Sequence, residues 1–85
     1  MKNMKTHILS IVTDKDPAGL LRLISIITRR RFRITSITVA GCEKRGYQRT
    51  IISMLNPDGD NNSIIQLMKQ IRKLINVVTV NEILS

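Results

Sequence analysis

The chain is poor in aromatic residues, cysteine and histidine, and each shortage argues against a class of function. It has no tryptophan, one phenylalanine (Phe32) and one tyrosine (Tyr47). Proteins that bind single-stranded nucleic acid stack bases on aromatic rings, at about 1–3 kcal/mol per base, so nucleic acid is an unfavoured partner. The only cysteine, Cys42, has no second thiol to pair with, and with His7 it cannot supply the four ligands of a structural zinc site.

Long apolar runs are also missing. The uncharged stretches 34–42 and 61–68 are far shorter than the ~18 apolar residues that a membrane-spanning helix needs. The N-terminus shows no basic start followed by an apolar run and a small-residue cleavage site, which a signal peptide would have. We therefore expect a cytoplasmic protein without a membrane segment.

Acidic residues are few, so the chain carries a strong positive charge. Fourteen Lys and Arg stand against six Asp and Glu, which gives a formal charge of +8. This balance favours an anionic partner, namely nucleic acid, a phosphorylated ligand or an acidic protein surface, and charge alone does not choose among them.

The chain has 85 residues, 42% of them hydrophobic, which is enough for one core. We expect a single domain over residues 1–85, with its core at about 6–84.

The first half of the chain predicts a strand, a helix and a second strand. The β-branched run Thr6–Thr13 is typical of a strand. Asp16 and Pro17 then signal a helix start, since Asp can cap and Pro fits the first helical position. Arg29–Arg31 are expected in the last turn, where cations interact favourably with the helix dipole. A second strand follows at Ile34–Ala40, and the helix stripe consists of Leu20, Leu23, Ile24 and Ile27.

The second half predicts a hairpin, a helix and a last strand. Gly41–Gly46 suits a hairpin loop, and Tyr47–Leu55 is the return strand. After a strong turn signal at 56–62, Asn62 or Ser63 is expected to cap a helix. Its apolar stripe is Ile64, Leu67, Met68, Ile71, Leu74 and Ile75, and the final strand is Val77–Leu84. The order βαββαβ predicts an α+β, ferredoxin-like fold, with a four-stranded antiparallel sheet and two helices on one face.

This arrangement leaves the other face of the sheet uncovered. We expect that face to present some of Leu9, Ile11, Ile37, Val39, Val78 and Val80. An exposed apolar sheet face or edge is typical of dimerisation, so an oligomer is expected. Leu21 and Ile26 lie outside the stripe of the first helix, which indicates either a broad core face or contact with a partner chain.

The sequence shows no catalytic constellation. The six carboxylates are scattered, and no histidine can be placed near Cys42 to activate it as a nucleophile. We expect no catalytic residues, no metal and no cofactor in this chain. The turn at 14–20 is the one feature with binding potential, because a helix N-terminus with free N–H groups binds carboxylates or phosphates. An ordinary capped helix start is the alternative.

Three segments carry a resemblance to a known family. ILSIVTDKDPAGLLRL, RRRFRITSITVA and MKQIRKLINVVTV together resemble the ACT domain of the small regulatory subunit of acetolactate synthase, over about residues 6–84. The more specific parts are Arg29–Arg30 before Phe32, the strand Ser36–Val39, and Lys69–Val77. The last is similar to the family's KQ-x-x-KLIDV segment, with Asn76 in place of Asp. Many members have a second, C-terminal domain, and we expect this chain to be the short, single-domain form.

The resemblance implies a non-catalytic subunit in branched-chain amino acid biosynthesis. It implies binding to the catalytic subunit, activation of it, and in many cases feedback by valine. Thiamine diphosphate, magnesium and FAD would belong to the catalytic subunit. The family's small amino-acid effector binds between two chains of a homodimer, at the turn opening the first helix and at the start of the neighbour's second strand. The matching candidates here are Asp14, Lys15, Asp16, Ala18, Gly19, Leu20, Arg33 and Ile34.

Three positions depart from the family's effector pattern. Lys15 and Arg33 replace two asparagines, and Ala18 replaces a glycine, unless a shift by one residue lets Gly19 serve. Two cations repel the ammonium group of valine, so we expect weak or absent valine feedback with activation retained. Arg29, Arg30 and Arg31 are candidates for contact with an acidic patch on the catalytic subunit, and a solvated helix end is the alternative.

Two other functions stay open. The first is a free-standing ACT-domain sensor of a small ligand, or another regulatory ACT module such as part of a stringent-response enzyme. The second is a basic nucleic-acid-binding module with a ferredoxin-like fold. The KLINV segment at 73–77 favours the acetolactate synthase subunit over the sensor, and the shortage of aromatic residues counts against nucleic acid.

Overall fold

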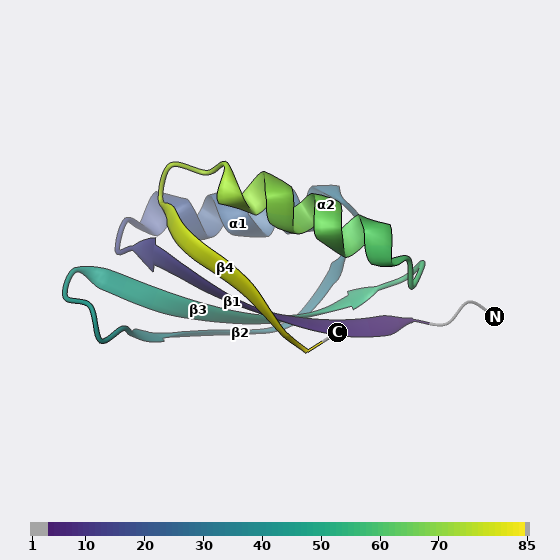
Figure 1. Ribbon diagram of the computed structural model, residues 1–85, viewed down its shortest axis with the longest axis horizontal. Coiled ribbons are helices and arrows are strands. Elements are labelled where there is room, and N and C mark those ends of the chain that lie inside the picture. The colour runs from purple at the N-terminus through teal and green to yellow at the C-terminus, as the bar shows by residue number, and fades with distance from the viewer. Residues whose placement is uncertain (1–3, 85) are drawn as a thin grey trace.

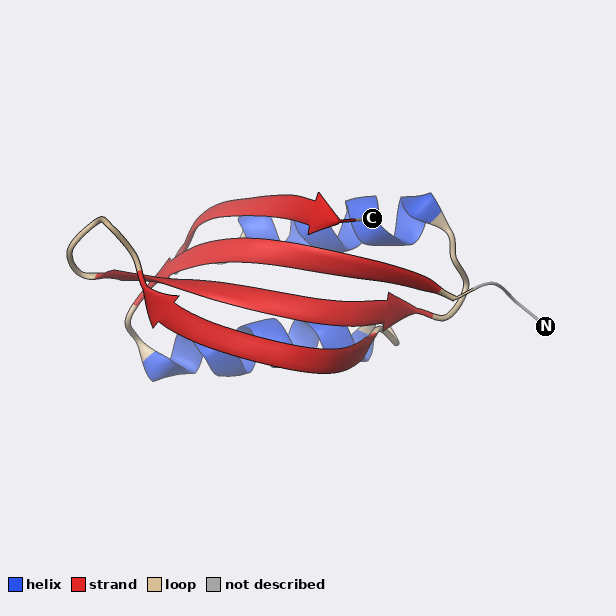
Figure 2. Ribbon diagram, turned by 90° about the horizontal axis from the view of Figure 1, so that it is seen from below, coloured by secondary structure: helices blue, strands red, loops and turns tan. Residues whose placement is uncertain are grey.

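The computed structural model describes residues 4–84 and has the predicted order of elements (Figure 1). These are β1 (Lys5–Asp14), α1 (Pro17–Arg29), β2 (Arg33–Gly41), β3 (Tyr47–Asn56), α2 (Asn61–Arg72) and β4 (Val77–Leu84). The strands form one antiparallel sheet in the order β2-β3-β1-β4, and both helices cover the same face of it (Figure 2). The predicted ferredoxin-like fold is confirmed. Neither helix of the described part of the chain is long and apolar enough to cross a membrane.

The core lies between the sheet and the two helices. Every second residue of the central strands β1 and β3 faces the helices, as the register pair Leu9↔Ile52 shows, and both side chains are fully buried. Burial of an aliphatic side chain of this size contributes about 1.5–3 kcal/mol. The connected core consists of Leu9, Ile11, Leu23, Ile27, Phe32, Ile52, Met54, Ile64, Leu67, Ile71 and Val80.

The expected apolar outer face of the sheet is wrong in part. Leu9, Ile11 and Val80 are buried under the helices, not on the uncovered face. Ile37 and Val39 are paired with the buried residues Ile52 and Thr50, so they too are on the helix side, and they are exposed because β2 is an edge strand. Register places a different set of residues on the uncovered face. Its small and polar members are Ser10, Ser36, Thr38, Ser53, Thr79 and Asn81, and its apolar members are Ile8, Val12, Ile51 and Leu55.

The second helix begins and ends earlier than expected. Its cap is Asp60, whose side chain accepts a hydrogen bond from the Asn62 N–H at 2.9 Å, so the prediction of Asn62 or Ser63 was wrong. The helix ends at Arg72, and Leu74 and Ile75 lie in the turn that follows. Leu74 still packs against the core, whereas Ile75 is 93% exposed.

The first helix ends in a turn that reverses the chain into β2. Of Arg29–Arg31, only Arg29 lies in the last turn, and Arg31 has a left-handed backbone with φ of 68°. The Arg31 N–H donates to the Thr28 carbonyl at 2.9 Å, and the Phe32 N–H donates to the Ile27 carbonyl at 3.3 Å. This pair of bonds is the Schellman motif, with Phe32 and Ile27 supplying its apolar contact.

Candidate functional site

The turn between β1 and α1 contains most of the candidate effector residues. The Asp16 carboxylate accepts from the Ala18 N–H at 3.0 Å, and the Asp16 carbonyl accepts from the Gly19 N–H at 3.0 Å. Pro17 has no N–H to offer. The helix start is therefore capped by the chain itself, and these two N–H groups, which the sequence suggested for a ligand, already have partners.

Asn76 ties this turn to the connection between α2 and β4. Its side-chain amide donates to both carboxylate oxygens of Asp14, at 3.2 and 2.9 Å. Its side-chain oxygen accepts from the Arg22 guanidinium at 2.7 Å, and its carbonyl accepts from the Asp14 N–H at 3.2 Å. From the sequence, Asn76 is a plausible stop of the second helix and a departure from the family's Asp. Its hydrogen bonds with the turn could not be predicted from the sequence, because only the fold brings Asn76 next to Asp14.

The structure separates the candidate effector residues into two groups. Asp14 to Leu20 surround the start of α1, whereas Arg33 and Ile34 begin β2, just beyond the opposite end of that helix. A helix of 13 residues is about 20 Å long at ~1.5 Å per residue. One chain therefore does not bring the two groups together, and a site that uses both needs a second chain.

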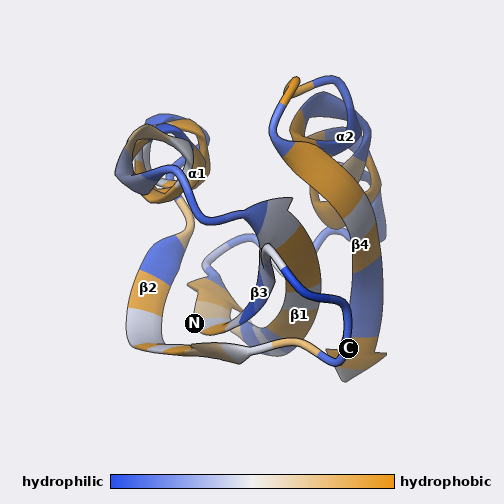
Figure 3. Ribbon diagram, turned by 90° about the vertical axis from the view of Figure 1, so that its left-hand side faces the viewer, coloured by the Kyte–Doolittle hydropathy of each residue, from blue (hydrophilic) through white to orange (hydrophobic). Residues whose placement is uncertain are grey.

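One edge of the sheet has the features of a surface that pairs with another chain. β2 is an edge strand of nine residues, and α1 is the helix that lies above this side of the sheet (Figure 3). Ile37 and Val39 on β2 are 37% and 43% exposed, and Leu21 on α1 is 69% exposed. Unpaired backbone beside exposed apolar side chains is a template for strand addition. Of the two residues outside the helix stripe, Ile26 packs against the core, and Leu21 remains exposed.

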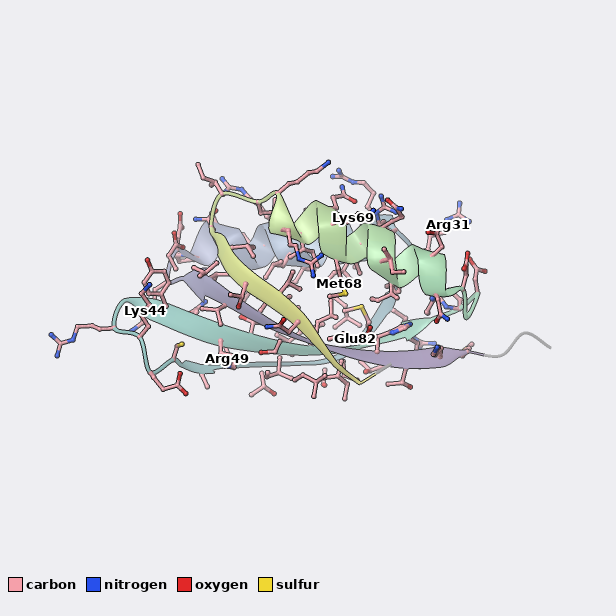
Figure 4. All side chains as sticks on the ribbon, in the orientation of Figure 1. Arg31, Lys44, Arg49, Met68, Lys69 and Glu82 are labelled. Carbon is pink, nitrogen blue, oxygen red and sulfur yellow. The ribbon has the colours of Figure 1, made fainter. Side chains whose placement is uncertain are left out.

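The arginine cluster meets the outer face of α2. The Arg30 Nε donates to the Gln70 side-chain oxygen at 2.5 Å, across 40 residues of sequence. Arg29 instead donates to the Ser25 hydroxyl at 3.3 Å. An open groove on this side is lined by Arg30, Gln66, Lys69, Gln70, Arg72 and Lys73, which we call the basic groove. Figure 4 shows Lys69 and Arg31 on the helical layer, away from the sheet.

The groups most often used in catalysis are dispersed or buried. In the part of the chain that the structure describes, no three of His, Cys, Asp and Glu gather where they could hold a metal ion. His7 is fully buried, and its Nδ1 lies 2.6 Å from a carboxylate oxygen of Glu82. The Cys42 thiol contacts Glu43 in the hairpin loop, at 3.8 Å. Neither His7 nor Cys42 lines the basic groove or belongs to the β1–α1 turn.

Comparison with known proteins agrees with the resemblance in sequence. The profile of the ACT domain family matches residues 15–80. The chain is 39% identical over 79 residues to the probable acetolactate synthase small subunit of Methanothermobacter thermautotrophicus, covering 92% of this chain and 45% of the relative. It is 38% identical over 80 residues to the acetolactate synthase small subunit of Buchnera aphidicola, covering 94% of this chain and 48% of that protein. The chain thus spans about half the length of the curated relatives it matches.

Solved structures support the same assignment. The acetolactate synthase small subunit of Thermotoga maritima superposes with a TM-score of 0.77 at 33% identity, covering 92% of this chain and 47% of that chain. The ACT domain of the GTP pyrophosphokinase of Chlorobium tepidum superposes equally well, at 0.77, over 95% of this chain and 100% of its own. Its identity of 17% shows a shared fold alone. The chain belongs to the ACT domain family and is similar in sequence and structure to the small subunits of acetolactate synthase.

Proposed function

We propose that this chain is the regulatory ACT domain of an acetolactate synthase small subunit, which binds the catalytic subunit and raises its activity. The observation that carries the proposal is the similarity to named small subunits, at 38–39% identity over more than nine tenths of the chain. The ACT fold alone would not distinguish this role, because the pyrophosphokinase domain has the same fold.

The working unit in this proposal is a homodimer. Two copies pair through the β2 edge, where Ile37, Val39 and Leu21 are exposed. Each copy then supplies the half of the effector site that the other lacks. The β1–α1 turn of one chain provides Asp14–Leu20, and the start of β2 of the other provides Arg33 and Ile34.

Valine feedback is weak or absent in this proposal, and activation is retained. Lys15 and Arg33 are both exposed and carry charges of the same sign as the ammonium group of valine. The carboxylate that would attract that ammonium, on Asp14, is already held by the Asn76 amide. Like charges at short range and an occupied acceptor both act against amino-acid binding.

Arg29–Arg31 contribute contacts to an acidic patch of the catalytic subunit. All three side chains are exposed. Arg31 adopts the left-handed conformation, which costs a non-glycine residue about 1–2 kcal/mol, so stability alone would favour glycine there. Strained backbone is concentrated at functional sites, and Arg31 combines such a backbone with an exposed charge.

Co-purification tests the proposal. The small subunit that carries this chain is mixed with the catalytic subunit of the same organism, and the mixture is resolved by size-exclusion chromatography with light scattering. The proposal expects co-elution, together with a dimer of the small subunit when it is run alone. Separate elution at micromolar concentration, without stimulation of acetolactate formation, would contradict it and favour a free-standing ACT-domain sensor.

A further inference from the structure

The basic groove concentrates positive charge on the outer face of α2. Four of its six lining residues are cationic, and the other two, Gln66 and Gln70, are neutral amides. Lys69 lies in the last turn of α2, Lys73 caps that helix four residues later, and Arg30 reaches the same surface from the end of α1. The described part of the chain provides no carboxylate within ion-pair distance of these cations.

Arg30 is held in place while its charge stays available. The bond from its Nε to Gln70 fixes the side chain against α2, and the acceptor is uncharged. The rest of the guanidinium keeps its N–H donors for a further acceptor. A cation that is positioned in advance loses less conformational entropy when it binds an anion than a freely rotating one does.

The spacing of the groove matches a helix with acidic residues. Residues three or four apart on a helix lie about 5–6 Å from each other at Cβ, so Lys69 is close to both Arg72 and the capping residue Lys73, and the three form a short basic ridge at the C-terminal end of α2. A partner helix with Asp or Glu at the same spacing would face this ridge with its carboxylates. Single-stranded nucleic acid fits less well, because no aromatic side chain lines the groove for base stacking.

We propose that the basic groove docks an acidic helix of the catalytic subunit. This inference rests on the proposed function and says where on the domain the catalytic subunit binds. The main contact lies on α2, and Arg30 connects it to the arginine cluster at the end of α1. Most residues that line the groove belong to α2, which lies over the β4 side of the sheet and away from β2 (Figure 3), so pairing of β2 edges leaves them accessible. One dimer would then present two such grooves.

The test compares two variants that lose the same charge. Lys69→Gln with Lys73→Gln removes two exposed cations from the groove, and glutamine keeps the helix propensity at Lys69, the one of the two that lies within α2. Lys44→Gln with Arg45→Gln removes two cations from the β2–β3 hairpin as a control. The dissociation constant for the catalytic subunit is measured at about 0.1 M and about 1 M salt, where the Debye length is ~10 and ~3 Å.

The inference expects the groove variant to bind about tenfold more weakly at low salt, with the difference shrinking at high salt. The hairpin variant should stay within about twofold of the unmodified protein. Unchanged binding of the groove variant, or an equal loss of affinity in both variants, would overturn the inference. The proposed function would still stand in that case, provided that the unmodified protein binds the catalytic subunit. Failure of the unmodified protein to bind the catalytic subunit would overturn both. Duplex DNA or RNA binding that the groove variant alone loses, with subunit binding intact, would identify a nucleic-acid partner instead.

Discussion

Asn76 donates a hydrogen bond to each carboxylate oxygen of Asp14, at 3.2 and 2.9 Å, although 62 residues separate them in sequence. The same side chain accepts from Arg22 at 2.7 Å. These bonds join the end of β1, the middle of α1 and the connection that follows α2. Asn76 therefore holds the candidate effector turn against the connection between α2 and β4, which follows directly after the basic groove.

Replacing Asn76 should remove the hydrogen bonds that hold the turn and lower the stability of the domain. In Asn76→Ala, the Asp14 carboxylate and the Arg22 guanidinium lose their partner, and we expect the free energy of unfolding to fall by about 1–2 kcal/mol. Urea denaturation of the full-length protein measures the change. Asn81→Ala is the matched control, because Asn81 is exposed on β4, and its effect should stay within about 0.5 kcal/mol. Equal effects of the two substitutions would show that Asn76 has no bracing role.

Replacement of Ile71 in α2 should lower the stability of the domain, whereas replacement of Ile75 in the turn after α2 should not. Ile71 is fully buried, so Ile71→Ala should cost about 2–5 kcal/mol of unfolding free energy. Ile75 is 93% exposed, so Ile75→Ala should change stability by no more than about 0.5 kcal/mol. Thermal or urea unfolding distinguishes them. A large loss in Ile75→Ala would mean that this side chain is covered, for example by a partner chain.

The same pair shows where sequence reasoning succeeded and where it failed. The 3.6-residue period placed Ile64, Leu67 and Ile71 correctly in the core, because a helix packed on a sheet must bury one face. It also assigned Ile75 to that face, since the pattern does not reveal that the helix ends at Arg72. The helix start was similarly misplaced, because Asp60, Asn62 and Ser63 are all competent caps.

The larger error was the prediction of which strand residues lie on the uncovered face of the sheet, and its cause is geometric. Alternation along a strand separates two sets of side chains, and it does not say which set the helices cover. The candidate site had the same limit. Residues 14–20 could be grouped from the sequence because they are adjacent in it. The contacts of Asp14 with Asn76 and of Arg30 with Gln70 depend on chain segments 62 and 40 residues apart.

Arg31 should show opposite effects on stability and on function. Because its φ is 68°, Arg31→Gly relieves a left-handed backbone and should raise the free energy of unfolding by about 1 kcal/mol. If Arg31 contacts the catalytic subunit, the same variant should activate that subunit less. Arg29→Gly, inside the helix, should instead lower stability by about 1 kcal/mol. A variant Arg31→Gly that is more stable and fully activating would exclude Arg31 from the contact.

Lys15 and Arg33 should control the response to valine. The double variant Lys15→Asn with Arg33→Asn replaces two exposed cations by the family's neutral amides, so the ammonium group is no longer repelled. We expect valine to inhibit the reconstituted enzyme at lower concentration than it does with the unmodified protein. Arg45→Asn, in the hairpin loop, is the control for charge alone. An unchanged dose response in the double variant would show that other features set the valine sensitivity.

The most direct measurement is acetolactate formation by the same organism's catalytic subunit, with and without the small subunit that carries this chain, across a valine titration. We predict a clear stimulation of the rate that valine reduces little or not at all. No stimulation at saturating small subunit would contradict the central claim that the chain is a regulatory domain of acetolactate synthase. Stimulation with strong valine inhibition would keep that claim and contradict the role given to Lys15 and Arg33.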